Sequence, residues 1–219
     1  MKRLKVVLIF LCISWTAFPQ SNVDLGLFAG TSHYMGDINK ERLFYAPSFS
    51  AGAFYRYVAN PRYAVKFAFT YAPVKGSDLD FNNDFQQLRG ESFRTTIGDI
   101  TAQFEFNFVK FQYSALRMTY SPYLSGGIGV ALMNREGTFS YDFIIPFGVG
   151  VKVNLSRRLS GMVLWEFRKT FMDEIDSVEN FPSQEFSSRL HNNDWYYIVG
   201  IGLSFRINYN KMLCPAYEH

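Results

Sequence analysis

A two-residue alternation of side-chain character near the end of the chain constrains the fold most strongly. Between Trp195 and Ile207, every second residue is apolar and mostly bulky, whereas the opposite face is mostly small or polar. Successive side chains of a β-strand point to opposite sides, so this pattern predicts a strand with one wholly apolar face. The same alternation recurs upstream, and no stretch of useful length keeps the helical spacing of apolar residues.

The alternation predicts eight strands, joined by links of unequal length. The expected strands are 22–30, 49–58, 63–71, 99–108, 122–132, 147–155, 161–169 and 195–207. The links 31–47, 73–93, 133–146 and 170–193 are long, 59–62 and 156–160 are short, and 109–121 is intermediate. In an antiparallel meander, this order would put the long links at one end and both termini at the other, as in outer-membrane barrels.

A soluble lipocalin-like barrel is also an eight-stranded meander, so the direction of the apolar face decides the class. The chain holds 23 Phe, 14 Tyr and 3 Trp, and so many aromatic side chains would not fit inside an eight-stranded barrel. Glycine shares the polar face, where it suits a crowded interior better than an exposed strand surface. We therefore expect an all-β fold: an eight-stranded antiparallel up-and-down transmembrane β-barrel with its aromatic face in lipid.

Nine charged residues would then face the lumen. They are Asp24, Arg56, Lys66, Asp99, Glu105, Lys152, Glu166, Arg168 and Arg206. Isolated charges in a narrow interior are costly, so we expect this nearly balanced set to form a paired network. The sequence thus predicts a plugged lumen. A plugged lumen argues against a function as a small pore or solute transporter.

The start of the chain has the features of a secretory signal peptide. Lys2, Arg3 and Lys5 precede an apolar run over 6–17 that is too short to span a bilayer. We expect residues 1–20 to be cleaved, leaving a barrel over 21–208 and a periplasmic tail over 209–219. Of the 22 basic residues, three lie in the signal, so the remainder equals the 19 acidic ones. A nucleic-acid partner therefore loses its electrostatic basis.

Cysteine use directs attention to the tail. Cys12 lies in the expected signal, so Cys214 would be the only thiol of the mature chain and no internal disulfide could form. The tail follows the last strand and should lie in the periplasm, which is oxidising. An unpaired cysteine there suggests intermolecular pairing, and the alternative is a tolerated free thiol.

Residues with catalytic chemistry are few. Ser32, His33, His191 and Asp194 could meet at the barrel rim, as in small outer-membrane enzymes such as lipid A acyl-modifying barrels. The alternative is that they are ordinary polar loop residues. No nucleophile motif, P-loop, dinucleotide fingerprint or metal-ligand spacing occurs, and the acidic stretch 173–179 lacks calcium-loop spacing, so no cofactor or metal is expected.

Two segments resemble a known family. GLFAGTSHYMGDIN at 26–39 and the ending Cys214-Pro215-Ala216-Tyr217 resemble the PorG-like outer-membrane barrels of the type IX secretion system of Bacteroidota. Related barrels of unknown role share the Gly36-Asp37 loop. The resemblance implies association with the periplasmic ring of the lipoprotein PorK and its partner PorN. Cys214, Pro215 and Tyr217 would then be the partner-binding residues, with Cys214 the candidate for a covalent contact.

We therefore expect a non-enzymatic anchor or docking component of this system, integral to the outer membrane, with both termini periplasmic and outer-membrane lipids around it. Two alternatives stay open. One is a rim-sited lipid-modifying enzyme, and the other is a paralogous barrel of unrelated role.

Overall fold

The computed structural model describes residues 22–36, 39, 42–81, 87, 90, 92–112, 118–135, 137–171 and 194–207. Within these ranges the strands are β1 (Asn22–Met35), β2 (Ser48–Val58), β3 (Tyr63–Tyr71), β4 (Val74–Ser77), β5 (Ser92–Asn107), β6 (Tyr120–Arg135), β7 (Thr138–Asn154), β8 (Leu159–Thr170) and β9 (Trp195–Arg206). A short 3-10 helix, η1 (Asp78–Asp80), follows β4. No helix in the described part of the chain is long and apolar enough to cross a membrane.

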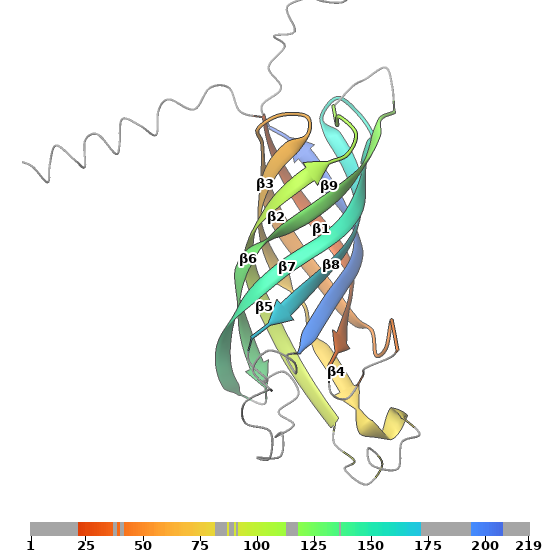
Figure 1. Ribbon diagram of the computed structural model, residues 1–219, viewed down its shortest axis with the longest axis vertical. Helices are drawn as coiled ribbons and strands as arrows, with labels where there is room; N and C mark the ends of the chain where they lie inside the picture. The colour runs from red at the N-terminus through yellow and green to blue at the C-terminus, as the bar shows by residue number, and fades with distance from the viewer. Residues whose placement is uncertain are drawn as a thin grey trace, which may run out of the picture.

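Eight of these strands close into an antiparallel barrel (Figure 1). Each pairs with its neighbour in sequence, β1 also pairs with β9, and β3 pairs with β5 to complete the ring. The short strand β4 lies outside this ring order and pairs only with the start of β5. The predicted eight-stranded antiparallel barrel is confirmed.

Four strands run further than the alternation predicted. β1 continues to Met35, five residues beyond its expected end at Gly30. β5 begins at Ser92, seven residues early, and β6 and β7 continue to Arg135 and from Thr138. The prediction of a long link over 133–146 is therefore wrong, because β6 and β7 form a hairpin. The turn of this hairpin contains Gly137, whose φ of 93° favours glycine. β4 and η1 likewise occupy part of the link expected over 73–93.

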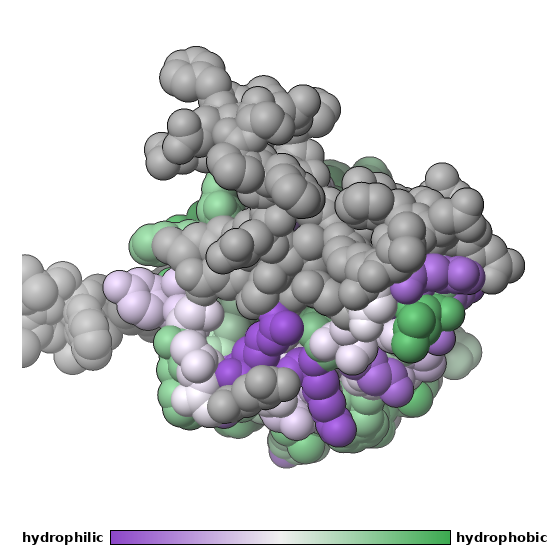
Figure 2. Space-filling model, turned by 90° about the horizontal axis from the view of Figure 1, so that it is seen from below, coloured by the Kyte–Doolittle hydropathy of each residue, from purple (hydrophilic) through white to green (hydrophobic). Residues whose placement is uncertain are grey.

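The outer wall of the barrel is apolar. Alternate residues of each strand are exposed, among them Leu27, Phe69, Ile100, Ile128, Phe143 and Ile201. Figure 2 views the barrel from the β4 end, where hydrophilic residues face the viewer and hydrophobic ones lie toward the sides. Such an exterior would be unstable in water but suits a bilayer, so the apolar face points outward as predicted.

Three aromatic rings inside the barrel lie over glycines of the neighbouring strand. Phe54 is opposite Gly26, Phe28 is opposite Gly52, and Tyr123 is opposite Gly150 in the strand register.

A Cβ on each of these glycines would meet the ring at 2.2–2.5 Å, so only glycine leaves the ring enough room. The sequence predicts a crowded interior around the glycines, and at these three positions the neighbours that need the space are aromatic rings.

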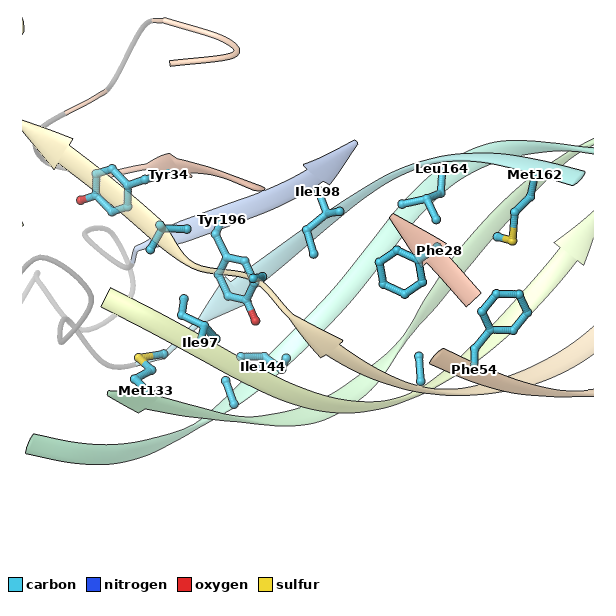
Figure 3. Packing of buried hydrophobic residues seen from close by; sticks show 14 of the residues in the cluster. Phe28, Tyr34, Phe54, Ile97, Met133, Ile144, Met162, Leu164, Tyr196 and Ile198 are labelled. Atoms are coloured by element: carbon cyan, nitrogen blue, oxygen red, sulfur yellow. The ribbon is translucent and has the colours of Figure 1, made fainter. Parts of the chain in front are cut away.

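Buried apolar residues continue toward the β4 end of the lumen. They form a cluster that includes Tyr34, Val74, Phe93, Ile97, Met133, Ile144, Tyr196 and Ile198 (Figure 3). The inner face is thus not only small and polar. It holds an apolar region near the long links, and along the rest of the axis charged side chains alternate with rings such as Phe54 and Tyr123.

Candidate functional site: the charged interior and the rim

The nine charged residues predicted for the lumen are all buried, and Arg206, the most exposed, has 7% of its surface accessible. Glu105 on β5 is the centre of one group. Its Oε2 lies 2.7 Å from Arg56 Nε and 2.6 Å from Lys152 Nζ, and its Oε1 lies 3.8 Å from Lys66 Nζ. Three cations from three strands therefore converge on one carboxylate.

A second group surrounds Glu166 on β8. Its carboxylate accepts hydrogen bonds from Lys66 Nζ and, at 3.3 Å, from Arg168 Nη2. Arg168 Nε in turn lies 2.8 Å from Asp99 Oδ2, which also accepts a 2.9 Å hydrogen bond from the Tyr196 hydroxyl. Lys66 belongs to both groups and joins them.

Asp24 extends this chain of contacts to the end of the barrel where β1 begins. Its carboxylate lies 2.8 Å from Arg206 Nε and 3.9 Å from Arg56 Nη1. Each of the nine residues thus has an oppositely charged partner within 4.0 Å. Lys152 also lies 4.5 Å from the centre of the Tyr123 ring on β6, so the network contacts all eight strands of the ring.

Such a network is a structural part of the barrel interior. Removing one member of a buried ion pair leaves an uncompensated charge in a medium of low dielectric constant, which is strongly unfavourable. The arrangement can hold the strands in register and fill the axis. The described residues include no group of three or more His, Cys, Asp or Glu side chains that could hold a metal ion.

The rim residues considered for catalysis do not converge. Ser32 points into the barrel, where its hydroxyl donates to the carbonyl oxygen of Pro73. His33 points outward and stacks on Tyr197 at a ring distance of 4.9 Å. Asp194 accepts a 2.7 Å hydrogen bond from the Tyr34 hydroxyl, and His191 lies outside the described residues. Because neighbouring residues of a strand face opposite sides, Ser32 and His33 do not form a catalytic pair.

The segment 42–47 folds against the outer wall near the rim, a feature that the sequence did not indicate. Phe44 and Ala46 have φ values of 61° and 44°, which non-glycine residues rarely adopt. The Phe44 ring lies 5.5 Å from His33, and its backbone N–H donates to the Tyr197 hydroxyl. No glycine or asparagine marks these positions, so no simple turn signal could have revealed them.

Tyr45 anchors this segment to η1. Its hydroxyl donates to Asp80 Oδ2 at 2.6 Å and also lies 3.1 Å from the Ser77 carbonyl oxygen. Burial, together with the hydrogen bond to Asp80, raises the pKa of Tyr45 to about 12. The phenol is therefore neutral at physiological pH and acts as a donor to the carboxylate.

Comparison with known families identifies the group to which this barrel belongs. Residues 2–216 match the family model described as "Domain of unknown function (DUF6089)". The chain belongs to the DUF6089 family. No curated protein matches this DUF6089 chain.

Several solved structures of outer-membrane proteins align with this chain. Neisserial surface protein A (NspA) of Neisseria aligns with a TM-score of 0.54 and 12% identity over 84% of the DUF6089 chain and 97% of NspA. The N-terminal barrel of OprF from Pseudomonas aeruginosa aligns at 0.47 with 9% identity, over 86% and 100% of the two chains. A major outer-membrane protein of Thermus thermophilus aligns at 0.45 with 12% identity, again over 86% and 100%. The likeness to NspA gives the DUF6089 chain the fold of an outer-membrane barrel.

Several predicted functional residues lie outside the described residues. They are Cys214, Pro215 and Tyr217 of the tail, the signal over 1–20 and the acidic stretch 173–179. For these the structure adds no contacts, and their roles stay predictions.

Proposed function

We propose that this DUF6089 protein is a non-enzymatic component of the type IX secretion system, integral to the outer membrane, that anchors or docks the periplasmic PorK/PorN ring. The observation that carries the proposal is the chain of ion pairs that contacts all eight strands and occupies the lumen. Because stabilising contacts fill the interior of the barrel, the protein would bind partners at its surface or through the segments that extend from it.

The orientation belongs to the same proposal. The start of β1 and the end of β9 lie at the end that holds the short turns 59–62 and 155–158 (Figure 1). In outer-membrane barrels the short turns are periplasmic and the longer links extracellular. Both termini, and with them the tail that follows β9, are therefore assigned to the periplasm.

In the segment that resembles PorG-like barrels, the surroundings of Gly36 explain why a glycine stands at that position. A Cβ at Gly36 would lie 2.1 Å from the Tyr34 hydroxyl and 2.3 Å from Asp194 Oδ1, the two partners of the rim hydrogen bond. A larger residue at Gly36 would therefore displace this hydrogen bond where β1 meets β9. We assign this segment to building the barrel, and the docking role to the tail.

In the tail, Cys214 is proposed to join a cysteine of the ring lipoprotein, with Pro215 and Tyr217 adjoining it. A disulfide forms when two thiols together lose two protons and two electrons to the oxidising machinery of the periplasm. The unmutated strain should then show a larger species on a non-reducing gel that disappears on reduction. Cys214→Ser should abolish it, whereas a His219→Ala control in the same tail should retain it.

A pull-down tests the docking itself. An affinity tag inserted in the link 171–193 leaves the tail free, and mild detergent extraction should recover the ring proteins with the barrel. Recovery without the reducible species would reject the covalent contact and keep noncovalent docking. Failure to recover any ring protein would contradict the proposed function.

A further inference from the structure

The turn end of the barrel carries four exposed basic side chains. Arg62 lies in the β2–β3 turn, Lys110 follows β5, and Arg157 and Arg158 form part of the β7–β8 turn. None of them forms an ion pair with a described acidic residue. Among the described residues at this end, the acidic side chains are Asp24 and Glu105, which are buried in the network. The exposed charge that the described residues place at this end is therefore of one sign.

The opposite end has a different charge pattern. Exposed Asp80 lies there with Arg42, whose Nη1 donates to the Asp80 carbonyl oxygen at 3.0 Å. The link between β8 and β9 is acidic in sequence, with only Arg189 against Asp173, Glu174, Asp176, Glu179 and Glu185. The sequence of the β5–β6 turn, by contrast, adds Arg117 and no acidic residue. The charges of the two ends are thus asymmetric.

The basic residues lie directly beside the lipid-facing wall. Exposed Tyr63 follows Arg62, and exposed Phe108 is two residues before Lys110. Arg62 Nη1 donates to the Phe108 carbonyl oxygen at 3.0 Å, which links two of the turns. Aromatic residues at barrel ends sit at headgroup depth, so the neighbouring guanidinium and ammonium groups lie at the level of lipid phosphates.

The cations are also spread around the barrel. They occupy all three turns of this end, which follow one another around the ring and together join six of its eight strands, leaving only β9 and β1 between the last turn and the first. Beside Arg157 and Arg158, a shallow hollow is lined by exposed Leu155 and by Ser156. A surrounding lipid leaflet can contact all three turns at once from outside the barrel.

We propose that these four cations, the basic belt, bind the phosphate headgroups of anionic phospholipids in the periplasmic leaflet. Basic groups beside a membrane surface attract anionic lipids, and the attraction is screened by salt. The belt needs no secretion partner, so it goes beyond the proposed function and shares with it only the orientation of the barrel.

The test measures which lipids stay bound to the full-length protein. The protein is extracted with mild detergent from membranes that contain phosphatidylethanolamine and phosphatidylglycerol, and the retained lipids are quantified by mass spectrometry. We expect phosphatidylglycerol to be enriched over its bulk ratio. In the variant R62Q/K110Q/R157Q/R158Q the enrichment should fall roughly tenfold. The control K75Q/R94Q neutralises two exposed cations at the other end and should retain it.

Three results would overturn the proposal. The first is equal enrichment in the quadruple variant and the unmutated protein. The second is an enrichment that follows added lipid A instead of phosphatidylglycerol, which would place the belt in the other leaflet. The third is loss of ring proteins from the quadruple variant with its lipids unchanged, which would make the belt a protein-binding surface.

Heat-dependent gel mobility shows whether the quadruple variant folds. If it does not, a salt series on the unmutated protein decides. Retention of phosphatidylglycerol should fall as salt rises to about 1 M, because screening shortens the range of the attraction. Retention that does not change with salt would contradict the proposal.

Discussion

The carboxylate of Glu105 accepts two hydrogen bonds from the Arg56 guanidinium, one from Nε at 2.7 Å and one from Nη2 at 3.2 Å. This two-point contact joins β5 to β2, strands that are not neighbours in the ring. It therefore bridges the inner face of β3, and β2 and β5 cannot move apart there without breaking it. A buried, two-point arginine–carboxylate pair of this kind has well-defined geometry.

Neutralising Glu105 should destabilise the barrel more than neutralising an exposed charge. Glu105→Gln leaves Arg56 and Lys152 buried beside an amide, and we expect a loss of about 3–5 kcal/mol in the free energy of unfolding. Lys75→Gln, on the exposed side of β4, should change it by less than about 0.5 kcal/mol. Urea-induced unfolding from lipid vesicles measures both. Equal effects of the two substitutions would show that the network does not support the fold.

A methyl group at Gly26 should be destabilising because the Phe54 ring occupies its place. The added Cβ would lie 2.2 Å from Phe54 Cζ, and we expect Gly26→Ala to cost about 1–3 kcal/mol through overpacking. Gly126 lies on an open part of the wall, where a Cβ meets no atom within 4 Å. Gly126→Ala should therefore be neutral or slightly stabilising. The same unfolding assay distinguishes the two, and an equally tolerated Gly26→Ala would disprove the ring-over-glycine packing.

The contact between Tyr45 and Asp80 should give the loop end a dependence on high pH. A pKa raised to about 12 in the folded state, above the ordinary value of 10.0, means that the contact stabilises fully below pH 10. Its contribution should be lost as the pH rises toward 12. The difference in ultraviolet phenolate absorbance between the unmutated protein and Tyr45→Phe isolates this one tyrosine. A midpoint near 10 would indicate that the hydroxyl is not bound.

The occupied lumen should make the protein a poor channel. Ion pairs along the axis and the apolar cluster near the long links leave side chains where a porin holds water. Purified protein in planar bilayers should therefore give negligible conductance. Steady currents of the size that porins carry would contradict this expectation.

Much of the fold was accessible to sequence analysis because a lipid-facing barrel repeats one simple pattern. Outward residues such as Ile201 and Leu203 must be apolar, whereas inward Ser204 and Arg206 need not be, so alternation marks each strand. The β6–β7 hairpin was missed because Asn134 and Arg135 on β6 look like loop residues. Its alternation nevertheless continues through exposed Phe139, Tyr141 and Phe143.

The contacts across the lumen could not be predicted to the same depth. The alternation identifies Glu105 and Arg56 as inward-facing, but which cation reaches which carboxylate depends on strand stagger and barrel closure. The same limit applies to Ser32 and His33, which are adjacent in sequence and lie on opposite faces. Phe54 over Gly26 depends on register, which pairs these two residues across β1 and β2.

The direction of the two faces is the claim on which the account depends, and spin labels on β9 test it most directly. In a Cys214→Ser background, single cysteines at Ile201, Leu203 and Ser204 carry a nitroxide in a reconstituted bilayer. The first two side chains are exposed on the wall, whereas Ser204 is buried in the lumen. We predict high accessibility to oxygen, which concentrates in lipid, at 201 and 203, and low accessibility at 204. High oxygen accessibility at 204 with low values at 201 and 203 would contradict the account.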